Sequence, residues 1–226
     1  MAEKINTLNF SHLFIFTLIL FSFAIYNSNV IFLTFDEYGQ GLESFDSSDN
    51  YLAFLYQIFL LGCAFLYLKF INFDFSQWLI KFNVSSVICG ILIFALIGFL
   101  SDIYFYIFDL LFGNQIFWQS KSDDTIGFDL ILYACLNGVY EELFFLGICL
   151  HVKVKNIIKA FIFSLIIRFL FHTYQSFFVA FGITMVVGGV FYLLYVKFNL
   201  KNLLPFFIAH GLADVFGLSF LGSFCE

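Results

Sequence analysis

Charged residues, basic residues and proline are all scarce in this sequence. Charged side chains make up 12% of the 226 residues, proline occurs once, and Lys and Arg together number ten. With a net charge of −6, so few basic residues leave no patch for a phosphate backbone, which excludes a nucleic-acid-binding protein. Disorder is excluded as well, because a disordered chain combines low hydrophobicity with high charge.

Hydrophobic residues dominate instead. They form 62% of the chain, against roughly 45–50% in an ordinary soluble domain. Phenylalanine alone occurs 38 times, and the mean hydropathy is +0.97. A soluble fold of this size cannot bury so much apolar surface. The sequence therefore predicts an integral membrane protein with one membrane domain, whose first partner is the lipid bilayer.

Cysteine chemistry and two familiar protease motifs are also missing. The five cysteines show no paired spacing, and four lie inside apolar runs, where a thiol behaves as a small hydrophobe. They predict neither a disulfide framework nor a thiolate metal site. GxSxG and HExxH do not occur. The cysteines are Cys63, Cys89, Cys135, Cys149 and Cys225.

Apolar runs set the expected fold. A spanning helix needs about 20 mostly apolar residues. Seven runs separated by polar breaks are candidates, namely residues 9–35, 51–72, 84–110, 127–151, 157–181, 182–198 and 203–222. We expect an all-α, polytopic transmembrane helix bundle of about seven spans, with an uncleaved first span. Residues 1–126 are expected to form N-terminal helices without a recognised motif, and residues 127–226 the catalytic core.

Two details of this threading are specific enough to check. The fifth and sixth runs are expected to meet at a very short turn near Phe181–Gly182. The third run is long and carries Asp102 and Asp109, so its outer end is expected to bend along the interface.

Basic residues give an independent estimate of orientation, because cytoplasmic loops collect Lys and Arg. An N-terminus on the inside places eight of the ten basic residues in inner segments. Lys121, beside Asp123 and Asp124, is then outside, and Arg168 lies within a span. We therefore expect a cytoplasmic N-terminus, an external C-terminus and a location in a cell membrane. The composition, low in bases and rich in Phe and Ile, favours a prokaryotic inner membrane.

Charged and imidazole side chains recur at depth in the last helices. Each charged side chain facing lipid at mid-bilayer costs roughly 2.5–3.5 kcal/mol, so such residues are expected to face inward and meet one another. His172 follows Arg168 by four residues, and Asp214 follows His210 by four, so each pair shares a helix face. His12 and His151 are expected at the interface instead. The set comprises Glu141, Glu142, Arg168, His172, His210 and Asp214.

These side chains suit hydrolysis by activated water. A glutamate beside a histidine can take a proton from water and pass it on. A second histidine, hydrogen-bonded by an aspartate at i+4, can present a fixed donor to a developing oxyanion. No serine or cysteine occupies a nucleophile-elbow context, so no covalent intermediate is expected.

The order of these motifs resembles the CPBP family of intramembrane glutamic proteases, which includes CAAX prenyl proteases and bacteriocin-processing and self-immunity (Abi-like) membrane proteins. EELFFLG is similar to the family's EExxxR motif, FHTYQS to its second motif, and HGLAD to its HxxxN/D motif, over roughly Leu130 to Leu218. The resemblance implies four core helices around a membrane-embedded, cytosol-accessible cavity.

It also implies roles for individual residues. Glu141 would activate water with His172, Glu142 would be the supporting carboxylate, and His210 with Asp214 would make the oxyanion site. Leu146 stands where the family has arginine. Since a buried glutamate pair needs a cation nearby, we hypothesise that Arg168 supplies the missing guanidinium.

The expected function is therefore a glutamate-dependent intramembrane endopeptidase acting on a membrane-associated peptide, with no cofactor and no metal. One alternative is a zinc-dependent membrane metallopeptidase, since histidines and carboxylates are zinc ligands. Another is a non-catalytic immunity or peptide-binding protein on the same fold, which is favoured by Leu146 in place of the motif arginine. A transporter is a weaker option, because nothing indicates inverted repeats. Neither the substrate nor the oligomeric state can be derived from the sequence.

Overall fold

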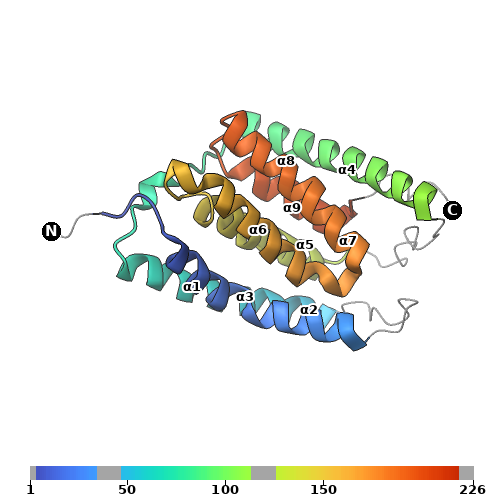
Figure 1. Ribbon diagram of the computed structural model, residues 1–226, viewed down its shortest axis with the longest axis horizontal. Coiled ribbons are helices and arrows are strands. Elements are labelled where there is room, and N and C mark those ends of the chain that lie inside the picture. The colour runs from blue at the N-terminus through green and yellow to red at the C-terminus, as the bar shows by residue number, and fades with distance from the viewer. Residues whose placement is uncertain (1–3, 35–46, 113–125, 219–226) are drawn as a thin grey trace.

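All regular elements in the described part of the protein are helices (Figure 1). The computed structural model describes residues 4–34, 47–112 and 126–218. The expected all-α bundle is confirmed over these residues. Lys121, Asp123, Asp124, Cys225 and most of the first expected outer loop, residues 36–46, lie outside them.

The helices run back and forth along the long axis of the molecule (Figure 1). In chain order they are α1 (Phe10–Leu20), α2 (Ser22–Thr34), α3 (Ser47–Phe70), α4 (Val84–Phe112), α5 (Phe128–Glu142), α6 (Ile157–His172), α7 (Phe177–Gly182), α8 (Gly189–Tyr192) and α9 (Leu204–Phe216). Three π-helical segments continue them, namely η3 (Leu143–Ile148), η6 (Ile183–Gly188) and η7 (Leu193–Lys197). The short 3-10 helices are η1 (Phe75–Gln77), η4 (Val154–Asn156) and η5 (Thr173–Gln175).

Four helical segments in the described residues are long and apolar enough to cross a membrane: Ser47–Phe70, Val84–Phe112, Phe128–Ile148 and Phe177–Lys197. The bent pair α1–α2 brings the number to five if it counts as one span. The expected seven spans are not confirmed, because α6 and α9, with 16 and 13 residues, are short for a bilayer. The chain nevertheless has the helices of a multi-pass membrane protein.

The turn expected near Phe181–Gly182 is wrong. Both residues are helical, and the chain turns earlier, at η5. Ser176 has a φ of 125° there, and its hydroxyl accepts a hydrogen bond from the Val179 backbone N–H, which caps α7. Polar residues of the TYQS stretch therefore end α6 at His172. The expected bend in the third run is not seen either, since α4 is one helix through Asp109 to Phe112.

The first apolar run forms two helices, although no charged residue, glycine or proline in the sequence marks the point where the first helix ends. α1 and α2 meet at 65° around Phe21, a buried residue. The Tyr140 hydroxyl of α5 donates a hydrogen bond to the Leu20 carbonyl at this bend. The Phe21 ring packs against the ring of Tyr140 and those of three phenylalanines, so the bend is held by side chains from distant helices.

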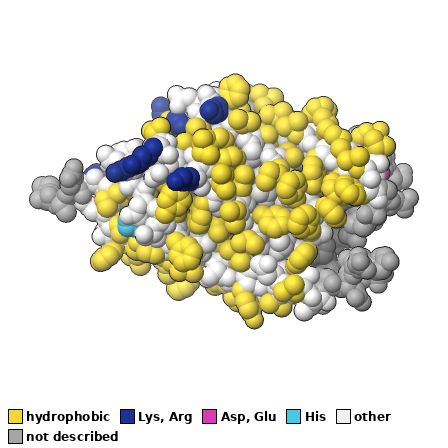
Figure 2. All heavy atoms as spheres, viewed as in Figure 1, with side chains coloured by type: hydrophobic (Ala, Val, Ile, Leu, Met, Phe, Trp, Pro, Cys, Tyr) yellow, Lys and Arg dark blue, Asp and Glu magenta, His cyan; other side chains and the backbone are white. Residues whose placement is uncertain are grey.

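One end of the bundle gathers segments from four parts of the chain. Backbone bridges join Ile5 to Phe73, Leu8 to Val152 and Leu79 to Asn202. Figure 2 shows Lys and Arg side chains at this end of the visible face and hydrophobic side chains over most of the rest. The segments expected to be cytoplasmic therefore share one end, although which side of the membrane they face stays a prediction.

Helices α5 and α9 cross at very short range. A Cβ added at Gly138 would lie 2.5 Å from the Phe207 carbonyl oxygen, and one at Gly211 would lie 3.1 Å from the Ala134 carbonyl oxygen. A side chain at position 138 would clash with this backbone, so the glycine permits the approach that brings the end of α5 beside the middle of α9. The two glutamates of α5 thereby reach His210.

Candidate functional site

The polar residues expected at depth converge on one buried cluster contributed by α5, α6 and α9. Glu141 and Glu142 are the last residues of α5, Arg168 and His172 lie in the last turns of α6, and His210 lies in the middle of α9. None of these five residues is more than 7% exposed. Asp214, one turn beyond His210, is more open, with 23% of its side chain exposed.

Glu142 forms the centre of the ion pairs. Arg168 Nη2 donates to both of its carboxylate oxygens, at 2.8 and 3.0 Å. His210 Nδ1 lies 2.6 Å from Glu142 Oε1 and donates to it, since a carboxylate in this ion pair accepts. The carboxylate of Glu142 is therefore fully engaged by one cation and one imidazole.

Glu141 is held by one oxygen only. Its Oε1 accepts from the side-chain amide of Asn137 at 3.1 Å. Its Oε2 is buried and makes no hydrogen bond, although Arg168 Nη1 lies 3.8 Å away and His210 Nε2 lies 3.6 Å away. The lone pairs of Glu141 Oε2 are thus free of hydrogen bonds, and the Arg168 guanidinium and the His210 imidazole are nitrogen-bearing groups near it.

The expected hydrogen bond between His210 and Asp214 is not formed. His210 Nε2 and Asp214 Oδ1 are 3.6 Å apart, which is too far for a hydrogen bond. His210 is oriented by Glu142 instead, and Asp214 Oδ2 accepts from Asn137 Nδ2 at 2.9 Å. The Nε2 edge of His210 therefore faces both Glu141 and Asp214.

His172 uses one ring nitrogen to bind its own helix. Nδ1 lies 2.8 Å from the Arg168 carbonyl oxygen, so Nδ1 carries the hydrogen and Nε2 is the acceptor of the neutral ring. This bond, rather than one to a glutamate, orients the ring. The pairing of His172 with Glu141 that the resemblance implies therefore stays a prediction.

Two amide side chains complete the cluster and were missed by the sequence reasoning. Asn137 Nδ2 bridges Glu141 and Asp214, and Gln57 Nε2 of α3 donates to Asn137 Oδ1 at 2.6 Å. Asn137 precedes Glu141 by one turn, and this i, i+4 spacing could have identified it. Gln57 lies in the N-terminal half, where no motif pointed to it.

Arg168 brings a guanidinium to the glutamate pair, whereas position 146 carries a leucine. Leu146 is buried within η3, the π-helical segment that directly follows Glu142. The Arg168 guanidinium stacks 4.0 Å above the Phe145 ring, which leaves its fork directed at the glutamates. The Trp78 indole donates to the Gly147 carbonyl in the same segment, at 2.6 Å. Such π-helical turns often occur at functional sites.

The remaining two histidines have hydrogen-bond partners outside the cluster, and their expected position at the membrane interface stays a prediction. His12 Nδ1 lies 2.8 Å from the Tyr67 hydroxyl, and His151 Nε2 donates to the Gln77 carbonyl oxygen at 3.3 Å. His151 lies in the loop after η3, outside the spans. Burial lowers the pKa of His151, because a charged ring would lose hydration there.

Three ligand atoms of the cluster could also hold a metal ion. Glu141, Glu142 and His210 each offer one atom, and these atoms lie within 4.8 Å of one another. Three such ligands match the number in catalytic zinc sites. However, both Glu142 oxygens already accept from Arg168, whose positive charge would repel a cation beside it.

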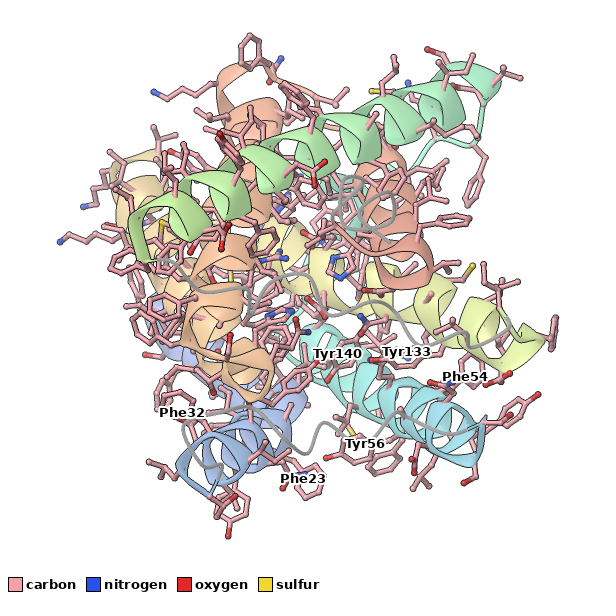
Figure 3. All side chains as sticks on the ribbon, turned by 90° about the vertical axis from the view of Figure 1, so that its right-hand side faces the viewer. Phe23, Phe32, Phe54, Tyr56, Tyr133 and Tyr140 are labelled. Carbon is pink, nitrogen blue, oxygen red and sulfur yellow. The ribbon has the colours of Figure 1, made fainter. Side chains whose placement is uncertain are left out.

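Figure 3 shows the aromatic side chains that lie between α5 and its neighbours. Tyr133 and Tyr140 of α5 lie on the side where α3 carries Phe54 and Tyr56 (Figure 3). Tyr56 meets Phe23 of α2 edge to face, with ring centroids 5.7 Å apart. Aromatic rings of α2, α3 and α5 therefore lie on the same side of the bundle.

Comparison with known families agrees with the three motifs. Residues 124–216 match a family model described as "Type II CAAX prenyl endopeptidase Rce1-like". The match covers less than half of the chain and includes Glu141, Glu142, Arg168, His172, His210 and Asp214. The resemblance to the CPBP and CAAX protease family is therefore confirmed for this segment. No curated protein and no solved structure matches the chain.

Proposed function

Because residues 124–216 match the type II CAAX prenyl endopeptidase family, we propose that this chain is an intramembrane peptide hydrolase in which Glu141 activates water. The observation that carries the proposal is the free Oε2 atom of Glu141. Both oxygens of Glu142 and Oε1 of Glu141 already accept hydrogen bonds. Glu141 Oε2 is therefore the oxygen of this glutamate pair that can take a proton.

The proposed reaction proceeds without a covalent intermediate. Glu141 Oε2 accepts a proton from a water molecule while the water oxygen attacks the carbonyl carbon of the scissile peptide bond. The carbonyl oxygen gains negative charge, and the bond to the amide nitrogen breaks as that nitrogen receives the proton. His172, whose Nε2 is the acceptor of the neutral ring, is proposed to share this proton transfer with Glu141.

His210 is proposed to stabilise the developing oxyanion, together with Asp214. With Nδ1–H directed at Glu142, His210 can donate from Nε2 only as an imidazolium. The carboxylates of Glu141, Glu142 and Asp214 surround the ring within 3.6 Å and are natural counter-charges of this form. The fixed donor would then act in a water-poor site, where such stabilisation is strongest.

The proposed substrate is a membrane-associated peptide, of the CAAX type that the family description names. A multi-pass protein with its polar cluster buried among helices suits a substrate that arrives from the bilayer. The proposed location is a cell membrane, of the prokaryotic inner type that the composition favours.

Peptide cleavage by the detergent-purified protein tests the proposal. Wild type, Glu141→Gln and His172→Ala are compared on a peptide library that includes prenylated sequences, with and without chelator. We expect chelator-resistant cleavage by wild type and a loss of about 10²–10⁴-fold in both variants. Glu141→Gln should keep the melting temperature, whereas Glu142→Gln should lower it, because Glu142 neutralises Arg168. Cleavage that persists in Glu141→Gln would overturn the proposal.

The same experiment decides between the two competing functions. A zinc metallopeptidase is favoured by the three convergent ligand atoms, and it predicts chelator-sensitive cleavage that added zinc restores. A non-catalytic peptide-binding protein is favoured by Leu146 in place of the motif arginine. It predicts no cleavage by folded wild type in this experiment, and a biological effect that survives Glu141→Gln.

A further inference from the structure

We propose that Gln57 of α3 is a positioning residue for the hydrolytic site, acting through the side-chain amide of Asn137. This inference rests on the proposed function and extends it to the N-terminal half of the chain, outside the segment that matches the family. It assigns Gln57 one task, which is to fix which end of the Asn137 amide faces the carboxylates.

The contacts form a directed chain. Gln57 Nε2 donates to Asn137 Oδ1 at 2.6 Å. Asn137 Nδ2 then donates its two hydrogens to Glu141 Oε1, at 3.1 Å, and to Asp214 Oδ2, at 2.9 Å. Gln57 and Asn137 are 9% and 6% exposed. One amide therefore links the proposed base on α5 to the proposed oxyanion site on α9.

The orientation of the amide matters because its two ends differ in chemistry. A reversed Asn137 would turn its carbonyl oxygen toward two carboxylates, so three acceptors would face one another without a hydrogen. An amide donor at Oδ1 favours the observed orientation, and Gln57 provides it. Among the described residues, the charged groups that face Asn137 are Glu141 on its own helix and Asp214 on α9.

The position of Glu141 depends on this link. Its Oε1 is tied to Asn137, and the remaining oxygen, Oε2, is the proposed base. If Asn137 turns, Glu141 loses the bond that fixes its carboxylate plane. Oε2 then no longer points reproducibly at the attacking water, and misplacement by about 1 Å can cost about a hundredfold in rate.

The test compares Gln57→Met, Gln57→Glu and Asn50→Leu with wild type, in detergent and on the cleaved peptide. Gln57→Met removes the donor at similar volume. Gln57→Glu presents an acceptor when ionised, but its protonated form donates an O–H to Asn137 Oδ1. Asn50→Leu is the matched control, because Asn50 Nδ2 of α3 donates to Asp129 of α5 at 2.8 Å, two turns from Gln57.

We expect Gln57→Met to lose about tenfold to a hundredfold in cleavage rate at every pH, while Asn50→Leu stays near wild type. The activity of Gln57→Glu, divided by that of wild type, should rise on going from about pH 8 to about pH 5, because the introduced carboxylate is buried and becomes protonated in this range. The introduced carboxylate also changes the titration of Glu141 and Asp214. The same ratio is therefore measured in an Asn137→Leu background, where the amide contributes nothing. A rise in the ratio that is equally large with and without Asn137, or a loss in Asn50→Leu as large as that in Gln57→Met, overturns the inference.

A second readout separates this inference from the proposed function. The melting temperature of Gln57→Glu relative to wild type should rise on acidification, whereas that of Gln57→Met should keep a constant difference. If wild type cleaves no peptide, the proposed function fails, but a rise in melting temperature that is larger with Asn137 than in the Asn137→Leu background still reports the orientation of the amide. If it is missing as well, the inference fails with it.

Discussion

At the scale of single residues, the two adjacent glutamates of the cluster differ in their hydrogen-bond partners. Glu142 receives Arg168 and His210, whereas Glu141 receives one amide and keeps one oxygen free. Adjacent residues of a helix point about 100° apart, so each meets different neighbours. This division of labour suits a site that needs one carboxylate for structure and one for proton transfer.

The exchange of guanidinium between positions 146 and 168 is testable. Arg168→Leu should abolish cleavage and destabilise the fold by about 3–5 kcal/mol, because it leaves the Glu142 carboxylate buried without a cation. Leu146→Arg, added to that variant, should restore part of both. The melting temperature and cleavage rate of the single and double variants are the measurements. A double variant no better than Arg168→Leu would argue against the exchange.

The lipid environment explains how much of the site the sequence could predict. Charged residues in apolar runs are costly, so Glu141, Arg168 and Asp214 could be recognised as members of one cluster. The need of the glutamates for Arg168 could be predicted from charge alone. Which atoms pair could not be predicted, because that depends on how far each helix rotates about its axis. Gln57 and Asn137 escaped notice because neutral amides often bond across membrane helices and are not a signal by themselves.

At the scale of elements, the site depends on how closely α5 approaches α9. Gly138 and Gly211 allow backbone contact there, and the glutamates reach His210 only because the two helices touch. Hydropathy located these helices well but missed the 65° bend at Phe21 and the turn at Ser176. Both lie inside continuous apolar runs, where tertiary contacts and a few polar residues decide the geometry.

Gly138→Ala should therefore reduce cleavage, although the atoms nearest to a Cβ at position 138 belong to the backbone of α9 and to no side chain of the polar cluster. The new methyl would lie 2.5 Å from the Phe207 carbonyl oxygen and force the helices apart. We expect a loss of about 1–3 kcal/mol in stability and about tenfold to a hundredfold in cleavage. Gly62→Ala is the control, since nothing lies within 4 Å of a Cβ at that position of α3. Equal behaviour of the two variants would refute the close-approach argument.

At the scale of the whole molecule, the basic segments share one end of the bundle. Backbone bridges at this end join residue 5 to 73, residue 8 to 152 and residue 79 to 202, which are far apart in sequence. The positive-inside rule assigns this end to the cytoplasm. The rule uses only the number of Lys and Arg residues in each loop. The side on which each loop lies is therefore measured directly in membrane vesicles.

Labelling of single cysteines with an impermeant thiol reagent provides that measurement. In a background without the natural cysteines, Lys153→Cys and Lys197→Cys should react in inside-out vesicles and stay protected in right-side-out ones. Phe128→Cys, at the start of α5, should show the opposite pattern. Reaction of the two lysine positions from opposite sides would contradict the threading.

The order in which the helices of the polar cluster are synthesised has a consequence for membrane insertion. When α5 leaves the ribosome, Glu142 has no counter-ion, because Arg168 follows 26 residues later and His210 follows 68 residues later. Two unpaired glutamates would cost on the order of 6 kcal/mol in lipid, so α5 is a poor substrate for the translocon on its own. Stable insertion of α5 must therefore await α6 and α9, and nascent chains that stop before Arg168 should be handed to membrane quality control.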